Sequence, residues 1–115
     1  MVKYNPNHQA VLGQIFSNHP FVRSGKMLGY PAYYVGEKLG VCLYENGVGV
    51  KLPAESVRRL LDTDENTTPF QPMGRPRMKE WIQINPGQSE AYWGYREVFE
   101  ESIDFVWSRQ QEDIG

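Results

Sequence analysis

The chain has 115 residues, of which 40% are hydrophobic, 13% aromatic and 23% charged. These proportions and the length predict a single folded domain over residues 1–115 and argue against a disordered chain. No apolar run in the sequence approaches the roughly 20 residues that a membrane-spanning helix needs. The formal net charge is −2, with seven acidic and two basic residues in the segment 88–115. This acidic excess argues against nonspecific nucleic-acid binding by the whole surface.

The cellular compartment is indicated by cysteine usage and by the N-terminus. Cys42 is the single cysteine, so no internal disulfide can form, and it stands in the apolar run Val41–Tyr44. A buried, inert thiol fits such a run better than a nucleophile does. The first residues, MVKYNPNHQ, lack the apolar stretch of a signal peptide. We therefore expect a reduced, cytoplasmic protein.

The chain begins with a helix expected over residues 6–18. Asn5 can cap it and Pro6 suits its first position. Apolar residues follow at helical spacing, and Pro20 disfavours helix at the residue before it.

A change of pattern at Phe21 predicts an antiparallel meander. Strands are expected near 22–28, 30–36, 38–44 and 47–52, with a hairpin turn at Gly36-Glu37-Lys38 and a stronger one at Glu45-Asn46-Gly47. Gly40 and Gly49 fall inside strands, which indicates bulges or places where another element packs closely.

The second half of the chain alternates helices with irregular segments. We expect a short helix over 54–61, a polar loop over 62–68, an ordered irregular loop through the proline-rich stretch 69–78, and a strand over 78–84. A last helix, capped by Asn85 or Ser89, should run to about Ser108, and the segment from Gln110 to Gly115 should fray. Its predicted buried stripe consists of Tyr92, Tyr95, Phe99, Ser102, Ile103 and Val106.

This order, α-β-β-β-β-α-β-α, predicts a two-layer α+β domain with a mostly antiparallel sheet and its helices packed on one face. The other face should meet solvent or form an interface. Several meander tyrosines should remain exposed there, which favours a homodimer formed through the sheet. The residues concerned are Tyr30, Tyr33, Tyr34 and Tyr44.

Short motifs across residues 8–108 resemble the N-terminal domain of the TfoX/Sxy family. They are Lys26-Met27-Leu28-Gly29, Gly36-Glu37-Lys38-Leu39, Val48–Leu52 and Pro69-Phe70. The YjbR-like proteins, with a similar two-layer fold, are the next closest family. The resemblance implies this fold and a link to proteins that regulate DNA-uptake competence. It implies no catalytic residue and no cofactor.

The basic residues Arg75, Arg77 and Lys79 are the first candidate binding site. Their proline-rich loop holds side chains at low entropic cost, and arginine can grip a carboxylate or phosphate with two hydrogen bonds. The sequence favours a structural interpretation over this one, in which the arginines pair with Glu80 or with the acidic C-terminal helix.

Lys26, Lys38 and Lys51 are the secondary candidates. Together with exposed tyrosines they could bind single-stranded nucleic acid along the sheet edges. Lysines that merely protect those edges from aggregation are the favoured interpretation.

No catalytic or metal-binding constellation is found in the sequence. His8 and His19 stand at opposite ends of the first helix, and no nucleotide-binding or nucleophile motif occurs. We therefore expect a non-enzymatic binding or regulatory module with a protein partner. The alternative is an enzyme or small-ligand binder with a pocket between the sheet and the last helix, lined by Tyr92, Trp93 and Trp81.

Overall fold

A computed structural model describes residues 2–114 of the chain, with side chains described through residue 112. Helices, strands and two short 3₁₀ helices alternate along it. In chain order they are α1 (Pro6–Phe16), β1 (Val22–Met27), β2 (Tyr30–Val35), β3 (Lys38–Tyr44), β4 (Gly47–Lys51), α2 (Ala54–Thr63), β5 (Thr67–Pro69), η1 (Pro72–Gly74), β6 (Trp81–Ile84), η2 (Ser89–Tyr95) and α3 (Arg96–Ile114). Among the helices of this described part, none has the length and apolar character needed to cross a membrane.

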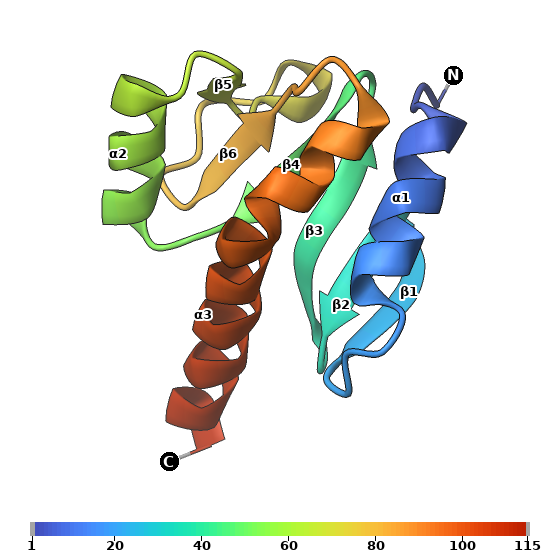
Figure 1. Cartoon of the computed structure of the whole chain (residues 1–115). Coiled ribbons are helices and arrows are strands. Elements are labelled where there is room, and N and C mark those ends of the chain that lie inside the picture. Colours follow the sequence, from blue (N-terminus) through green and yellow to red (C-terminus); the bar gives the residue numbers. More distant parts are fainter. Residues whose placement is uncertain (1, 115) are drawn as a thin grey trace.

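The strands form one antiparallel sheet in the order β1-β2-β3-β4-β6-β5 (Figure 1). The first four are joined as a meander, and β6 pairs with β4 across the excursion through α2. The predicted α+β class and element order are confirmed.

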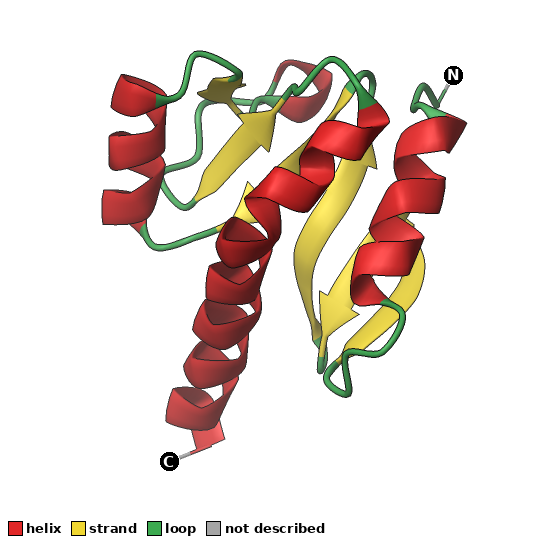
Figure 2. Cartoon of the chain, viewed as in Figure 1, coloured by secondary structure: helices red, strands yellow, loops and turns green. Residues whose placement is uncertain are grey.

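The α-helices lie on one face of this sheet (Figure 2). The other face, which carries the 3₁₀ helix η1 but no α-helix of the described chain, is called the helix-free face. The core between the layers is apolar. Its largest fully buried side chains include Leu12 of α1, Leu43 and Ile82 of the sheet, and Phe99 of α3. The predicted stripe of the last helix is confirmed, with Tyr95 half-buried and the other members buried.

Both strand glycines have the role that the sequence predicted. Gly40 lies beside a register shift between β2 and β3, where a side chain would crowd Val35. Gly49 in β4 lies under the ring of Phe70, and a Cβ atom there would stand 2.6 Å from that ring. A close approach of another element, rather than a turn, requires glycine at position 49.

The helix-free face of the sheet differs from expectation. The segment after β5 folds back over it, and Phe70 forms a second buried cluster there with Ala32 and Cys42. None of the four meander tyrosines is exposed: Tyr30 and Tyr33 are buried, whereas Tyr34 and Tyr44 are half-buried. The expected surface of exposed tyrosines is therefore wrong, because Tyr33 packs into the main core beneath the helices and the chain covers part of the helix-free face with its own loop.

Several element boundaries also differ from the predicted ones. The first helix ends at Phe16, α2 continues to Thr63, and β6 begins only at Trp81. The loop expected over 62–68 contains the start of β5, a short edge strand. The buried Thr67 hydroxyl lies within hydrogen-bond distance of the carbonyl oxygens of Asp64 and Leu60, at 2.7 and 3.0 Å, and so ties this strand to the end of α2.

The C-terminal helix is longer than predicted. Residues 89–95 form a 3₁₀ helix, and α3 then continues to Ile114, so the prediction of fraying from Gln110 onward is wrong for the described residues. The Gln110 amide donates to the carbonyl of Val35 at 2.7 Å and accepts from the Glu37 N–H at 3.0 Å. These bonds hold α3 against the β2–β3 turn.

Candidate functional site

The proline-rich loop is attached to the helix-free face at its beginning by Phe70. This residue is 2% exposed, and its ring packs over Gly49 between the rings of Tyr44 and Trp81 at centroid distances of 5.8 and 5.6 Å. Farther along the loop, the N–H of Met73 donates to the Tyr44 hydroxyl at 3.0 Å. The loop is therefore an ordered part of the fold.

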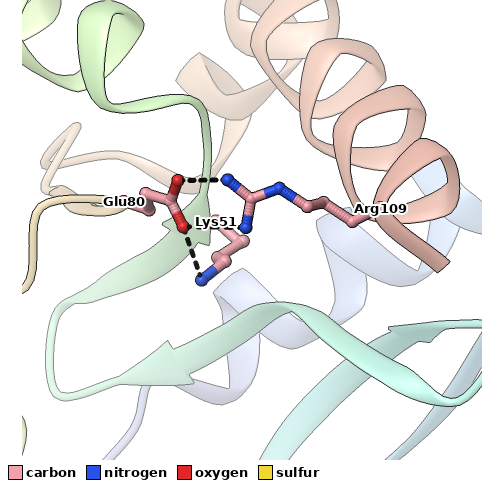
Figure 3. Close-up of polar contacts among 3 residues, drawn as sticks. All are labelled: Lys51, Glu80 and Arg109. Carbon is pink, nitrogen blue, oxygen red and sulfur yellow. Dashed lines mark hydrogen bonds and ion pairs between the residues drawn. The ribbon is translucent and has the colours of Figure 1, made fainter. Parts of the chain in front are cut away.

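Glu80 fixes the other end of the loop to two elements (Figure 3). Its carboxylate accepts two hydrogen bonds from the Arg109 guanidinium of α3, at 2.6 and 3.3 Å, and lies 3.3 Å from Lys51 Nζ of β4. The bidentate bond from Arg109, followed by the charge of Lys51, lowers the pKa of Glu80.

An apolar hollow of about 270 Å³ lies between this loop and the tip of the β1–β2 hairpin. Three methionines, two aromatic residues and one arginine contribute to its lining. The complete lining is Met27, Leu28, Leu39, Phe70, Pro72, Met73, Arg75, Met78 and Trp81.

Leu28 and Met73 have an unusual backbone conformation at this hollow. Their φ angles are 52° and 56°, in the left-handed region that bulky side chains disfavour. Both side chains are exposed, Leu28 at 63% and Met73 at 52%. Leu28 and Gly29 form the two-residue hairpin turn, where both φ angles are positive and Asn-Gly is the preferred sequence. Two apolar side chains thus project at positions where polar residues would fit better.

Arg75 is the single charged residue in the lining of the hollow. Its guanidinium makes no hydrogen bond or ion pair with the part of the chain that the structure describes. A free guanidinium beside an apolar surface can receive a carboxylate with two parallel hydrogen bonds.

The other two predicted cations of this loop lie elsewhere. Arg77 and Lys79 line a separate hollow of about 380 Å³ together with Arg58 of α2. The three-residue site expected from the sequence is therefore divided between two surfaces. The favoured structural interpretation, in which these arginines pair with acids, is wrong for the described residues, because Glu80 is occupied by Lys51 and Arg109.

Lys26, Lys38 and Lys51 do not form a common surface. Lys26 is exposed on the edge strand β1, but Lys38 and Lys51 stand at the ends of the inner strands β3 and β4. Lys51 also lies over the Trp81 ring, 5.7 Å from its centroid, while it pairs with Glu80.

Cys42 and His8, two side chains with reactive chemistry, are both buried. Cys42 is 1% exposed, and burial raises the pKa of its thiol to about 12. His8 is buried against Tyr92, with its Nδ1 3.0 Å from the Tyr92 hydroxyl. Within residues 2–114 no three His, Cys, Asp or Glu side chains come together in a way that could hold a metal ion.

The pocket expected between the sheet and the last helix is not formed by the residues named for it. Tyr92 is fully buried in the main core, Trp93 is exposed, and Trp81 belongs to the cluster on the opposite face of the sheet. Sequence reasoning in turn missed the methionine-lined hollow. The available signal was the presence of apolar residues, Leu28 and Met73, at turn positions that normally take Gly, Asn or Asp.

No protein-family model matches the sequence, and neither the curated proteins nor the solved structures contain a significant match to it. Any functional assignment therefore depends on the geometry described above.

Proposed function

We propose that this chain is a protein-binding module whose working surface is the methionine-lined hollow on the helix-free face. A partner segment inserts a large apolar side chain into the hollow and places a carboxylate on Arg75. The observation that carries this proposal is that Leu28 and Met73, two exposed apolar residues in left-handed conformations, line the same hollow.

The backbone conformations support a binding role because they are costly. A bulky residue in the left-handed region costs about 1–2 kcal/mol, and such strain concentrates at functional sites. In the free chain, the exposed apolar side chains of Leu28 and Met73 contribute no hydrophobic stabilisation to the fold. Coverage by a partner would remove both side chains from water and offset the cost.

The size of the hollow favours a macromolecular partner over a small molecule. Its volume of about 270 Å³ lies below the range of roughly 300–1,000 Å³ typical of small-ligand pockets. A small ligand would also leave the tips of Leu28 and Met73 in water, whereas a protein surface would cover them. Methionine side chains adapt their shape to the surface they meet, which suits recognition of an inserted side chain.

The charge of the lining favours a different protein over a second copy. In a symmetric dimer the same surface meets itself, so two Arg75 guanidinium groups would approach without an acid in either lining. For this reason a second copy of the chain, as in a homodimer formed through the sheet, is the less favoured occupant of the hollow.

The lone buried thiol of Cys42 is compatible with the reducing cytoplasm, where we place the module as a regulatory protein. A kinship with the TfoX/Sxy proteins is part of this proposal, supported by the sequence motifs alone.

Selection from a library of random short peptides tests the proposed site. We expect the selected peptides to share a large apolar residue next to Asp or Glu. Arg75→Gln should lower the affinity for these peptides by about tenfold or more, because a charge-assisted bidentate bond is lost. Arg77→Gln is the matched control, since Arg77 lines the other hollow, and it should leave affinity unchanged. If the selected peptides bind the Arg75→Gln and Leu28→Asn variants as tightly as they bind the wild-type protein, the proposal is refuted.

Anion binding is a second candidate function, favoured by the hollow of Arg58, Arg77 and Lys79. The lining of this hollow includes no acid, and none of its three cations is paired within the described chain. Titration with inorganic phosphate, followed by NMR, should shift the amide signals of Arg58 and Arg77 in a salt-dependent manner. Unchanged signals at high phosphate, or equal shifts in an Arg77→Gln variant, would exclude this role.

A further inference from the structure

The strand β1 forms a free edge of the sheet. It pairs with β2 along its whole length from Val22 to Met27, and no other strand of the described chain lies on its outer side. In Figure 1, β1 forms the outer margin of the sheet behind α1. The opposite edge is protected, because β5 has three residues and ends at Pro69. The β1 edge has neither device, since it has six residues and contains no proline, and its protection against a second copy of the chain consists of the charges of Arg23 and Lys26.

The register shows which backbone groups face outward. Met27 and Tyr30 flank the two-residue turn and are paired by hydrogen bonds, so the alternating pattern of an antiparallel ladder directs the backbone groups of Ser24 and Lys26 away from β2. The Lys26 carbonyl already accepts a bond from the Tyr34 hydroxyl at 2.9 Å. Both backbone groups of Ser24 and the N–H of Lys26 remain available to an added strand.

A groove of about 420 Å³ lies beside this edge, between α1 and β1. Its described lining is uncharged and includes Phe16, Ser24 and Tyr33. Tyr33 is 7% exposed, and its hydroxyl makes no hydrogen bond within the described chain. Because strand side chains alternate between the two faces, every second residue of a strand added to β1 would point toward this groove, whose lining includes Tyr33.

The charges of β1 indicate what the added strand carries. Arg23 and Lys26 are its charged residues, and they lie on opposite faces of the sheet. A second copy pairing through β1 would bring together two cations from each strand without an acid. An extended segment in which acidic residues alternate with apolar ones would instead place its carboxylates on the face of Arg23 and its apolar side chains in the groove on the other face.

We propose that β1 accepts an extended acidic segment of another protein as a further strand of the sheet, with its alternate small or apolar side chains in the α1–β1 groove. Such strand addition takes its affinity from main-chain hydrogen bonds and its specificity from the alternate side chains. This interaction does not depend on the methionine-lined hollow, with which the edge shares Met27 alone.

A capped synthetic peptide of alternating Glu and Val is the probe for this proposal. Titrated into the labelled protein, it should shift the NMR signals of Ser24 and Lys26 and slow the exchange of their amide hydrogens. The same peptide with Lys in place of Glu should not bind. A version with N-methyl groups on the backbone edge that faces β1 should bind about tenfold more weakly or worse, because it cannot donate the main-chain bonds.

Ser24→Pro is the protein variant that completes the test. It removes an N–H that points outward, which an edge strand tolerates, so the protein should stay folded but lose the peptide. Ser24→Ala is the matched control and should bind normally. Absence of any binding by the Glu-Val peptide, or equal binding of its N-methylated version, would overturn the proposal even if the proline variant does not fold.

Discussion

Leu28 and Met73 come from opposite halves of the chain, yet they line one hollow and both adopt positive φ angles, of 52° and 56°. The β1–β2 turn supplies the first residue and the proline-rich loop supplies the second. Each is an exposed apolar side chain on a backbone conformation that suits Gly or Asn. The surface that we propose for partner binding therefore carries a cost in stability.

Replacement of Leu28 by Asn should stabilise the protein. Asn-Gly is the preferred pair for a turn in which both central residues have positive φ, so the free energy of unfolding should rise by up to about 1 kcal/mol. Leu28→Ala is the control, because it removes the same apolar tip but keeps the unfavourable conformation. Urea unfolding measures both variants, and a gain that is equal in the two would show that turn strain is not the cause.

Replacement of Gly49 by Ala should detach the beginning of the loop. The new Cβ atom would stand 2.6 Å from the Phe70 ring, so the ring must move, at a cost of about 1–3 kcal/mol in the free energy of unfolding. Trp81 packs against Phe70, and its fluorescence should therefore change. Gly13→Ala is the contrasting variant, since its Cβ atom has room and its helix should gain about 1 kcal/mol. A Gly49→Ala protein of unchanged stability would contradict the packing described here.

The Glu80 ion pairs should make a modest, acid-sensitive contribution to stability. The pKa of Glu80 is lowered in the folded state by Arg109 and Lys51, so the contribution is present above the ordinary value of 4.5 and is lost as the pH falls through the lower folded value. Glu80→Gln should cost about 0.5–1 kcal/mol at neutral pH, because both cations are partly exposed to solvent. The difference between wild type and variant should shrink below pH 4.5 and at high salt. A difference that grows in acid would contradict this assignment.

His8 should make the free energy of unfolding depend on pH in a second range, above that of Glu80. Burial lowers the pKa of His8 from its ordinary value of 6.5, so the unfolded chain binds a proton before the folded chain does. Stability should therefore fall as the pH drops below about 6.5. His8→Asn, which can keep a bond to the Tyr92 hydroxyl but cannot titrate, should be less stable at pH 7 and should lack this slope between pH 7 and 5. If thermal or urea unfolding gives the same slope of stability against pH for the wild-type protein and for His8→Asn, His8 is excluded as the source of that slope.

The meander could be predicted from the sequence because turn chemistry determines it locally. Asn46-Gly47 and Gly36 mark two of its turns, and the β3 bounds of 38–44 agree with the prediction. The glycine at position 49 even indicated a close approach by another element. Its partner, Phe70, could not be identified, because no local pattern shows which segment will fold back over a sheet face.

The candidate site was only partly predictable for the same reason. The loop and Arg75 were identified, but Arg75 and Arg77 are close in sequence and lie on different surfaces. An irregular backbone has no period from which side-chain directions can be inferred. The length of α3 was missed because the bonds of Gln110 to the β2–β3 turn are tertiary contacts.

The most direct test of the proposed binding surface is the double variant Leu28→Asn plus Met73→Gly, measured for both stability and affinity toward the library-selected peptides. Our account predicts opposite changes: the free energy of unfolding rises because two strained residues are replaced by residues that accept positive φ, while peptide affinity falls by about tenfold or more because the apolar tips are gone. Unchanged affinity in a correctly folded double variant would contradict the account.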